Sequence, residues 1–165
     1  MAKYFFILIL SWGFFDFASA QKKISKIDIT ISDNNGFQFL SQDYRITHDS
    51  LFITGVSDNG KTKVDYLKRM LTKSEKKQIQ LFFTKFSCDS LQKEYFNEFN
   101  SMGYITYDHY PRVINMTLKK NDNYCETKIT NCFVYRVSNM INYLNDFFPA
   151  EVKIFFKKED FKVAY

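Results

Sequence analysis

Short runs in which hydrophobic and polar residues alternate constrain the fold of this chain more than any other feature. Between residues 26 and 32, Ile27, Ile29 and Ile31 alternate with polar residues. Successive side chains of a β-strand point to opposite faces, so this run predicts a strand with one buried face. Residues 112–119 show the same alternation and predict a second strand of this kind.

Turn-forming residues separate these runs and predict hairpins. The Asp-Asn-Gly at 58–60 suits a type I′ turn, which should join a strand at 51–56 to a strand that includes 62–66. The Asn-Asp-Asn at 121–123 predicts a second hairpin, which leads into a strand at 124–129. Because a hairpin pairs neighbouring strands in opposite directions, we expect a mostly antiparallel sheet.

Two segments have the 3.6-residue period of amphipathic helices. The first is expected at 73–86, after a capping box in which the side chains of Thr72 and Glu75 each bond the backbone N–H of the other. The second is expected at 134–148, because Pro149 disfavours helical geometry in the residue before it. Their apolar stripes are Ile79, Phe82, Phe83 and Phe86 in the first, and Val137, Met140, Ile141, Leu144 and Phe148 in the second.

These elements predict an α+β fold, a mostly antiparallel sheet with two main helices packed on one face. A chain of 165 residues suits one domain of this kind and is too short for two ordinary ones. Further short strands are expected at 37–40, 44–46, 104–107 and 152–156. The last of these strands should complete the sheet after the second helix.

The N-terminal residues have the pattern of a secretory signal peptide. A lysine precedes an apolar run at 4–15, and Ala18 and Ala20 occupy the small-residue positions of a cleavage site. We expect cleavage after Ala20, giving a signal peptide at 1–20 and a single domain at 21–165 that is secreted or periplasmic. The apolar run is short for a bilayer span, so no transmembrane segment is expected after cleavage. An uncleaved N-terminal anchor is the alternative.

The charge pattern gives no strong indication of a polyanionic partner. The formal net charge is +5, and only four of the 23 basic residues are arginines, whose planar fork favours phosphate recognition. The basic residues are spread along the chain, so we expect solvated faces and no nucleic-acid partner. The basic and aromatic stretch at 153–162 fits an edge strand that lysines protect from aggregation. A membrane-surface or polyanion contact is the alternative for this stretch.

Residue spacing yields no catalytic, cofactor-binding or metal-binding set. His48 and His109 are the only histidines, and neither belongs to a zinc motif or a family signature of nucleophilic enzymes. The sequence also has no glycine-rich phosphate loop. We therefore assign no catalytic, metal or cofactor residues. The enzymatic alternative is a small secreted hydrolase that uses His109 or His48 with acids brought close by folding.

The three cysteines leave the disulfide pairing open. Export would place Cys88, Cys125 and Cys132 in an oxidising compartment, and an odd count leaves one without an intramolecular partner. Along a straight strand, Cys125 and Cys132 would lie more than about 20 Å apart, so their bridge requires a chain reversal. A bridge from Cys88 to either one is equally possible, as are three buried free thiols.

Two short motifs resemble a bacterial family. The chain contains Leu91-x-x-x-Tyr95-Phe96-Asn97, then a strand hairpin, and then Tyr143-Leu144-Asn145-x-x-x-Pro149. Over residues 62–156, this arrangement resembles small exported proteins of unknown function from Bacteroidota-type bacteria. The resemblance implies an α+β fold and an envelope or secreted location, and it supplies no catalytic residues. The leading hypothesis is an exported, non-enzymatic domain that binds an unidentified partner or ligand in the envelope or outside the cell. A small hydrolase and a polyanion-binding protein are the alternatives.

Overall fold

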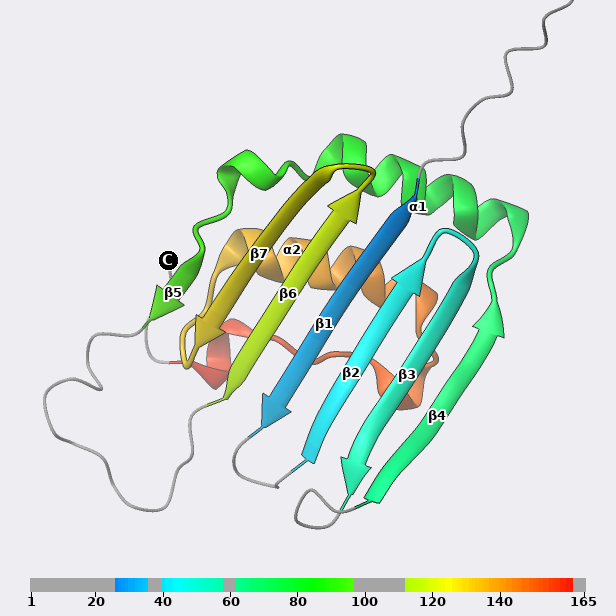
Figure 1. The fold of residues 1–165 in the computed structure, drawn as a ribbon. Helices are drawn as coiled ribbons and strands as arrows, with labels where there is room; N and C mark the ends of the chain where they lie inside the picture. The colour runs from blue at the N-terminus through cyan, green and yellow to red at the C-terminus, as the bar shows by residue number, and fades with distance from the viewer. Residues whose placement is uncertain (1–25, 36–39, 58–61, 97–111, 162–165) are drawn as a thin grey trace, which may run out of the picture.

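A computed structural model of the chain describes residues 26–35, 40–57, 62–96 and 112–161. Within these ranges, seven strands form one sheet in the order β4-β3-β2-β1-β6-β7-β5 (Figure 1). The strands are β1 (Ile27–Asn35), β2 (Leu40–Thr47), β3 (Ser50–Ser57), β4 (Thr62–Met70), β5 (Glu94–Phe96), β6 (Val113–Lys120) and β7 (Asn123–Thr130). Every pair is antiparallel except β5–β7, which confirms the α+β class and the mostly antiparallel sheet.

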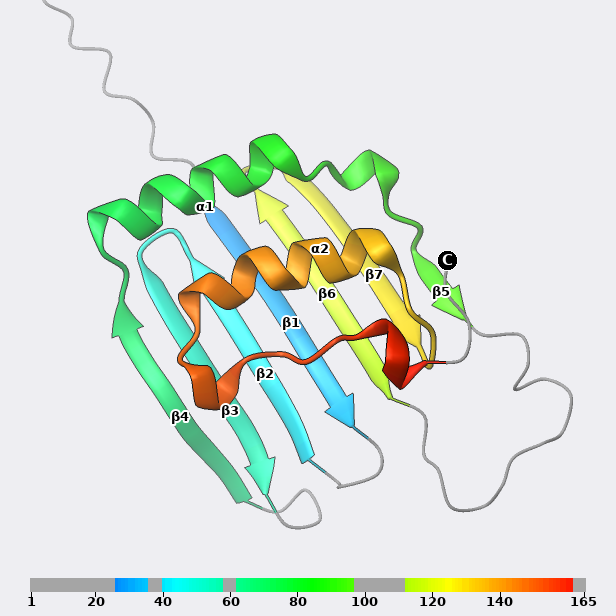
Figure 2. The ribbon, with the colours of Figure 1, turned by 180° about the vertical axis from the view of Figure 1, so that it is seen from behind.

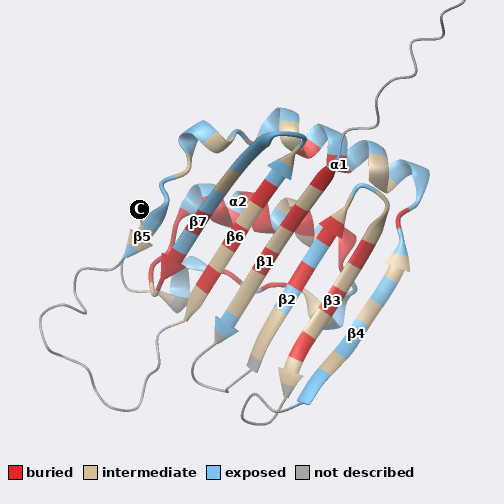
Figure 3. Cartoon of the chain, in the orientation of Figure 1, coloured by how far each residue is buried: buried red, intermediate tan, exposed pale blue. Residues whose placement is uncertain are grey.

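The register of the central strands separates a buried face from a polar face. Ile29 on β1 lies opposite Ile46 on β2 and Leu118 on β6, and all three side chains are buried. The next residue, Thr30, lies opposite Thr117 on the other face, and both are half-buried. Figure 3 shows the resulting alternation of buried and less buried residues along these strands. The alternation in the sequence therefore predicts the correct faces.

Two helices accompany the sheet, α1 (Lys73–Lys85) and α2 (Tyr135–Leu144). Figure 2 shows α2 lying across the buried face of the sheet, while α1 runs along the rim formed by the strand ends. The capping box of Thr72 and Glu75 is present, as predicted. The helices contact each other through the rings of Phe82 and Tyr143, whose centroids lie 5.7 Å apart. None of the helices in the described ranges is long and apolar enough to span a bilayer.

The segment that follows α2 differs from the prediction. The helix ends at Leu144, where a 3₁₀ turn (Asn145–Phe147) replaces the last turn of the expected helix. The predicted strand at 152–156 is absent, since the chain there makes a 3₁₀ turn (Ala150–Val152) and then runs extended beside α2 (Figure 2). Its backbone at Ile154 bonds the side-chain amide of Asn145 in both directions, each at 2.9 Å. We call residues 153–157 the C-terminal segment.

The alternation at 152–156 predicted a strand that is not formed, and there is a physical reason for the difference. Ile154 and Phe156 of the C-terminal segment are buried against the core, while Phe155 between them is exposed. An extended chain that packs on a core alternates in the same way as a strand, whether or not it joins a sheet. The interpretation of this stretch as an edge strand guarded by lysines is therefore wrong.

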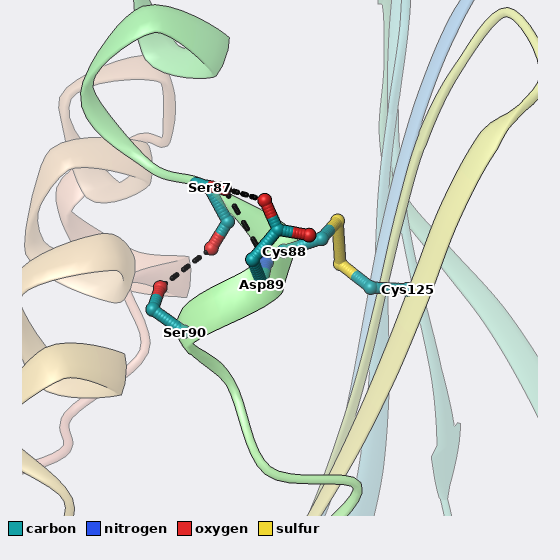
Figure 4. Close-up of a disulfide and its surroundings, with 5 residues drawn as sticks. All are labelled: Ser87, Cys88, Asp89, Ser90 and Cys125. Carbon is teal, nitrogen blue, oxygen red and sulfur yellow. Dashed lines mark hydrogen bonds between the residues drawn. A yellow bond between two sulfur atoms is a disulfide. The ribbon is translucent and has the colours of Figure 1, made fainter.

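A disulfide joins the end of α1 to the sheet. Cys88, in the 3₁₀ turn Cys88–Ser90, is bonded to Cys125 on β7, with Cα atoms 5.5 Å apart (Figure 4). Cys132 is the free cysteine and is fully buried. Of the pairings that the sequence left open, the bridge from Cys88 to Cys125 is the one formed.

Several predictions fall on residues outside the described ranges. These are the signal peptide at 1–20, the turn at 58–60, the strand at 104–107, most of the strand at 37–40, and His109. The strands on either side of the 58–60 turn pair antiparallel, which confirms that hairpin. The hairpin between β6 and β7 is also confirmed. The three-residue strand β5, which pairs parallel to β7, is too short to show an alternation and was not predicted.

Candidate functional site

The face of the sheet opposite α2 is the candidate functional surface, and we call it the open face. No element that the structure describes lies over it (Figures 1 and 2). On β1, β2, β3 and β6, none of the described side chains that point to this face is buried. Its centre carries small polar side chains, with Thr30 opposite Thr117 and Ser32 opposite Asn115. Such a surface is compatible with water and lacks the apolar core of an obligate subunit interface.

The open face is hollowed at one end, where β2 turns into β3. The hollow has a volume of about 450 Å³ and is lined by Lys26, Ile27, Asp28, Arg45, Thr47, His48, Asp49, Ser50, Phe52 and Lys119. Most of these residues come from four neighbouring strands, because Asp28 lies opposite both Thr47 and Lys119, and Arg45 lies opposite Phe52. The lining therefore depends on the sheet order and is largely held by paired backbone.

Arg45 and Asp28 form a two-point ion pair in the hollow. The Nε and Nη2 atoms of Arg45 donate to the two carboxylate oxygens of Asp28, at 3.1 and 2.6 Å. This hydrogen bonding raises the pKa of Arg45 above its ordinary value. Guanidinium has five N–H donors, and these two bonds leave three of them directed elsewhere.

The turn between β2 and β3 is organised around Asp49. Its carboxylate accepts hydrogen bonds from the hydroxyls of Thr47, at 3.0 Å, and Ser50, at 2.9 Å. These bonds hold the pKa of Asp49 below its usual value, so the group is a carboxylate at neutral pH. The Nε2 atom of His48 lies 3.5 Å from the same carboxylate. The backbone carbonyl of Asp49 also accepts from the N–H of Leu71, at 2.7 Å, which ties the turn to the start of α1.

The arrangement at this turn bears on the hydrolase alternative. His48 is exposed, and the hydroxyls of Thr47 and Ser50 lie near it in the hollow, both bonded to Asp49. Ser50 donates its hydroxyl proton to Asp49, however, so the acid lies between the hydroxyl and the imidazole. A nucleophile needs the imidazole as its direct hydrogen-bond partner, with the acid on the far side of that ring. The hydrogen bonds here are those of a capped turn.

Basic groups outnumber acidic groups in the hollow. Lys26 and Lys119 make no ion pair with any residue that the structure describes, whereas Asp28 is already paired with Arg45. Asp49 is the second acid, and it faces His48. Even with His48 neutral, the lining carries three positive charges against two negative ones. The hollow is therefore electropositive, within a face whose other charges are mixed.

A second polar cluster lies on the buried face and has a structural role. Arg112 pairs with Asp33 through bonds of 2.9 and 2.6 Å, and both side chains are mostly buried. Its Nη1 atom donates to the carbonyl of Phe155, at 2.6 Å, and so fixes the C-terminal segment. Nearby, Tyr44 donates its hydroxyl proton to Gln42, and burial raises the pKa of Tyr44 above its usual value. The members of this cluster bond one another, so it offers no open position to a ligand.

Comparison with protein-family models, with curated proteins and with solved structures finds no match to this chain. Among the described residues, no three His, Cys, Asp or Glu side chains gather in a way that could hold a metal ion.

Proposed function

We propose that this chain is an exported, non-enzymatic binding domain whose open face holds a ligand or partner, centred on the hollow. In this proposal the other face of the sheet has a structural role, because α1, α2 and the C-terminal segment contribute buried side chains to the core on that side. The hollow is the single observation that carries the proposal, because it is a concave site with an excess of basic residues, on a face that no described element covers. Its lining comes largely from paired strands, which favours a preformed site.

The hydrolase alternative has less support. The hydroxyls of Thr47 and Ser50 bond the Asp49 carboxylate and not His48, so the hollow lacks an activated nucleophile among the residues described. His109 lies outside the described ranges. Turnover of an activated ester that disappears in the His48→Ala variant would contradict the non-enzymatic proposal.

Binding of an extended polyanion has less support than binding at one site. The described basic residues on the open face, the hollow included, are Lys26, Arg45, Lys63, Lys68, Lys119 and Lys128, and the acidic ones are Asp28, Asp43, Asp49, Asp65, Glu94 and Glu126. A polyanion laid across this face would meet as many carboxylates as cations, and like charges repel. Excess positive charge is found at the hollow.

Export is supported by the signal-peptide pattern at 1–20 and by the disulfide between Cys88 and Cys125, which is a bond typical of oxidising compartments. A secreted or periplasmic location is therefore part of the proposal. Mass analysis of the N-terminus of the protein recovered from its native cell should give a chain beginning at Gln21. Recovery of an intact Met1 from the membrane fraction would contradict it.

A fragment titration followed by NMR tests the binding proposal. Neutral, anionic and cationic small molecules are added in turn to the ¹⁵N-labelled protein. At least one class should shift the amide signals of residues 47–50, together with those of Asp28 and Lys119, because these residues line the hollow. Shifts confined to α2 or to the C-terminal segment would contradict the proposed location.

A further inference from the structure

The chemistry of the hollow indicates what kind of ligand it accepts, an inference that rests on the function proposed above. Lys26 and Lys119 lie on its wall with no acidic partner among the residues described, so each ammonium keeps three donors for an incoming group. Both oxygens of the Asp28 carboxylate accept from Arg45, and Asp28 forms no ion pair with either lysine. Two ammonium groups without acids favour an anion as the ligand.

Arg45 adds donors at the same wall. Asp28 occupies its Nε and one N–H of Nη2, which leaves Nη1 with both of its hydrogens and Nη2 with one. The bond to Asp28 also orients the guanidinium, so less side-chain entropy is lost when a ligand arrives. A ligand oxyanion can therefore bond Arg45 without displacing Asp28.

The lining of the hollow also includes an aromatic ring. Phe52 lies opposite Arg45 on the neighbouring strand and lines the hollow. The ammonium of Lys68 stands 5.9 Å from the centre of this ring, so the ring already lies in a cationic environment. A ligand that carries its charge on one end and an apolar body on the other fits a lining that combines these cations with a ring.

The size and surroundings of the hollow limit the ligand to a small molecule. A volume of about 450 Å³ lies within the range of pockets that hold small organic molecules, roughly 300–1,000 Å³. Next to the hollow, the open face carries the carboxylates of Asp43 and Glu126, which would repel the remainder of a longer anionic chain.

We infer that the hollow binds a small organic oxyanion, a carboxylate or a phosphate monoester, with its charged end at Lys26, Lys119 and Arg45 and its apolar body on Phe52. The shared chemistry is a singly or doubly charged oxyanion attached to a compact apolar group. Charge pairing sets the position of the charged end, and ring contact sets the position of the apolar end.

The test is an NMR titration of the full chain with four compounds: phenyl phosphate, benzoate, inorganic phosphate and benzyl alcohol. Phenyl phosphate or benzoate should shift the signals of the hollow more strongly than inorganic phosphate or benzyl alcohol does, because only the first two offer both an anion and a ring. Binding of phenyl phosphate alone would assign the site to phosphate monoesters, and equal binding of benzoate would extend it to carboxylates. Equal binding of benzyl alcohol and benzoate would overturn the inference and leave the binding proposal intact.

Two matched lysine variants distinguish binding at the hollow from a general effect of the protein's positive charge. Lys119→Gln should weaken binding of the preferred anion by about three- to tenfold, since it removes one exposed charge contact. Lys63→Gln makes the same change at the far end of the same face and should leave the affinity unchanged. An equal loss in both variants, or no loss in Lys119→Gln, would overturn the inference. Both lysines are exposed, so both variants should fold, and their thermal melts check this.

Discussion

Arg69 connects three parts of the molecule through one guanidinium group. Its Nη1 and Nη2 atoms donate to the two carboxylate oxygens of Glu75, at 3.0 and 2.6 Å, which joins β4 to the first turn of α1. Nη2 also donates to the carbonyl of Phe147, at 3.0 Å, in the turn after α2. Glu75 closes the capping box with Thr72 at the same time. One ion pair therefore holds α1 in position relative to the sheet and to α2.

The Arg69 hydrogen bonds predict a pH dependence of stability. They are the largest cause that lowers the pKa of Glu75, to about 2 from an ordinary 4.5, and the bonds with Thr72 contribute less. Because the folded pKa lies below the unfolded one, this stabilisation is complete above about pH 4.5 and is lost as pH falls toward 2. Glu75→Gln should lower the free energy of unfolding by roughly 1–2 kcal/mol at pH 7, allowing for solvent screening.

Urea unfolding of both proteins at pH 7, 4 and 2.5 checks this prediction. The difference between wild type and Glu75→Gln should shrink steadily as the carboxylate of the wild type becomes protonated. A difference that stays constant down to pH 2.5 would show that the ionised carboxylate contributes nothing beyond its hydrogen-bonding shape.

The helix α2 is the element that closes the core over the sheet. Its residues Val137, Met140, Ile141 and Leu144 are fully buried, as the stripe in the sequence predicted, whereas Asn142 is exposed. Leu144→Ala should cost about 2–5 kcal/mol of unfolding free energy, because it removes buried methyl groups and leaves a cavity. Asn142→Ala should change the free energy by little, with a small gain from helix propensity. Urea melts of the two variants measure this, and equal small effects would contradict the packing described here.

Helices, caps and hairpins that depend on neighbouring residues could be predicted from the sequence, whereas pairings between distant strands could not. The capping box and the hairpin of β3 with β4 depend on neighbouring residues and are correct in the structure. The pairing of β1 with β6, which sets Ile27 opposite Lys120, joins residues far apart in sequence and has no local signal. The side-chain amide of Asn145 holds the C-terminal segment through Ile154. Nothing near Asn145 in the sequence indicates that partner.

The candidate site could not be predicted from the sequence, because its residues lie on strands that are far apart along the chain. Lys26, Arg45 and Lys119 are brought together only because β1 lies between β2 and β6 in the sheet. Read along the chain, each is an ordinary charged residue on a strand or at its end. His48 was named as a candidate, and it does line the hollow, although its neighbours there are those of a turn.

At the scale of the whole molecule, the disulfide restrains the chain between α1 and β7. Cys88 and Cys125 are separated by 37 positions, and such a cross-link reduces the conformational entropy of the unfolded chain. Replacing both with serine should lower the free energy of unfolding by about 2–4 kcal/mol. Reductant should destabilise the wild type by a similar amount and leave the double variant unchanged. Urea midpoints of the wild type that are the same with and without reductant would contradict the bridge.

The open face of the sheet should be exposed to solvent in the native protein. Thr30 lies at the middle of this face, opposite Thr117, whereas the native free thiol, Cys132, is fully buried and burial raises its pKa. The most direct test is therefore the labelling of the Thr30→Cys variant with a bulky charged maleimide under native conditions, read by mass spectrometry. The variant should take up one label rapidly, and the wild type should take up none until it is unfolded. A native variant that resists labelling would contradict this expectation, because another part of the chain or a second copy would then cover the face.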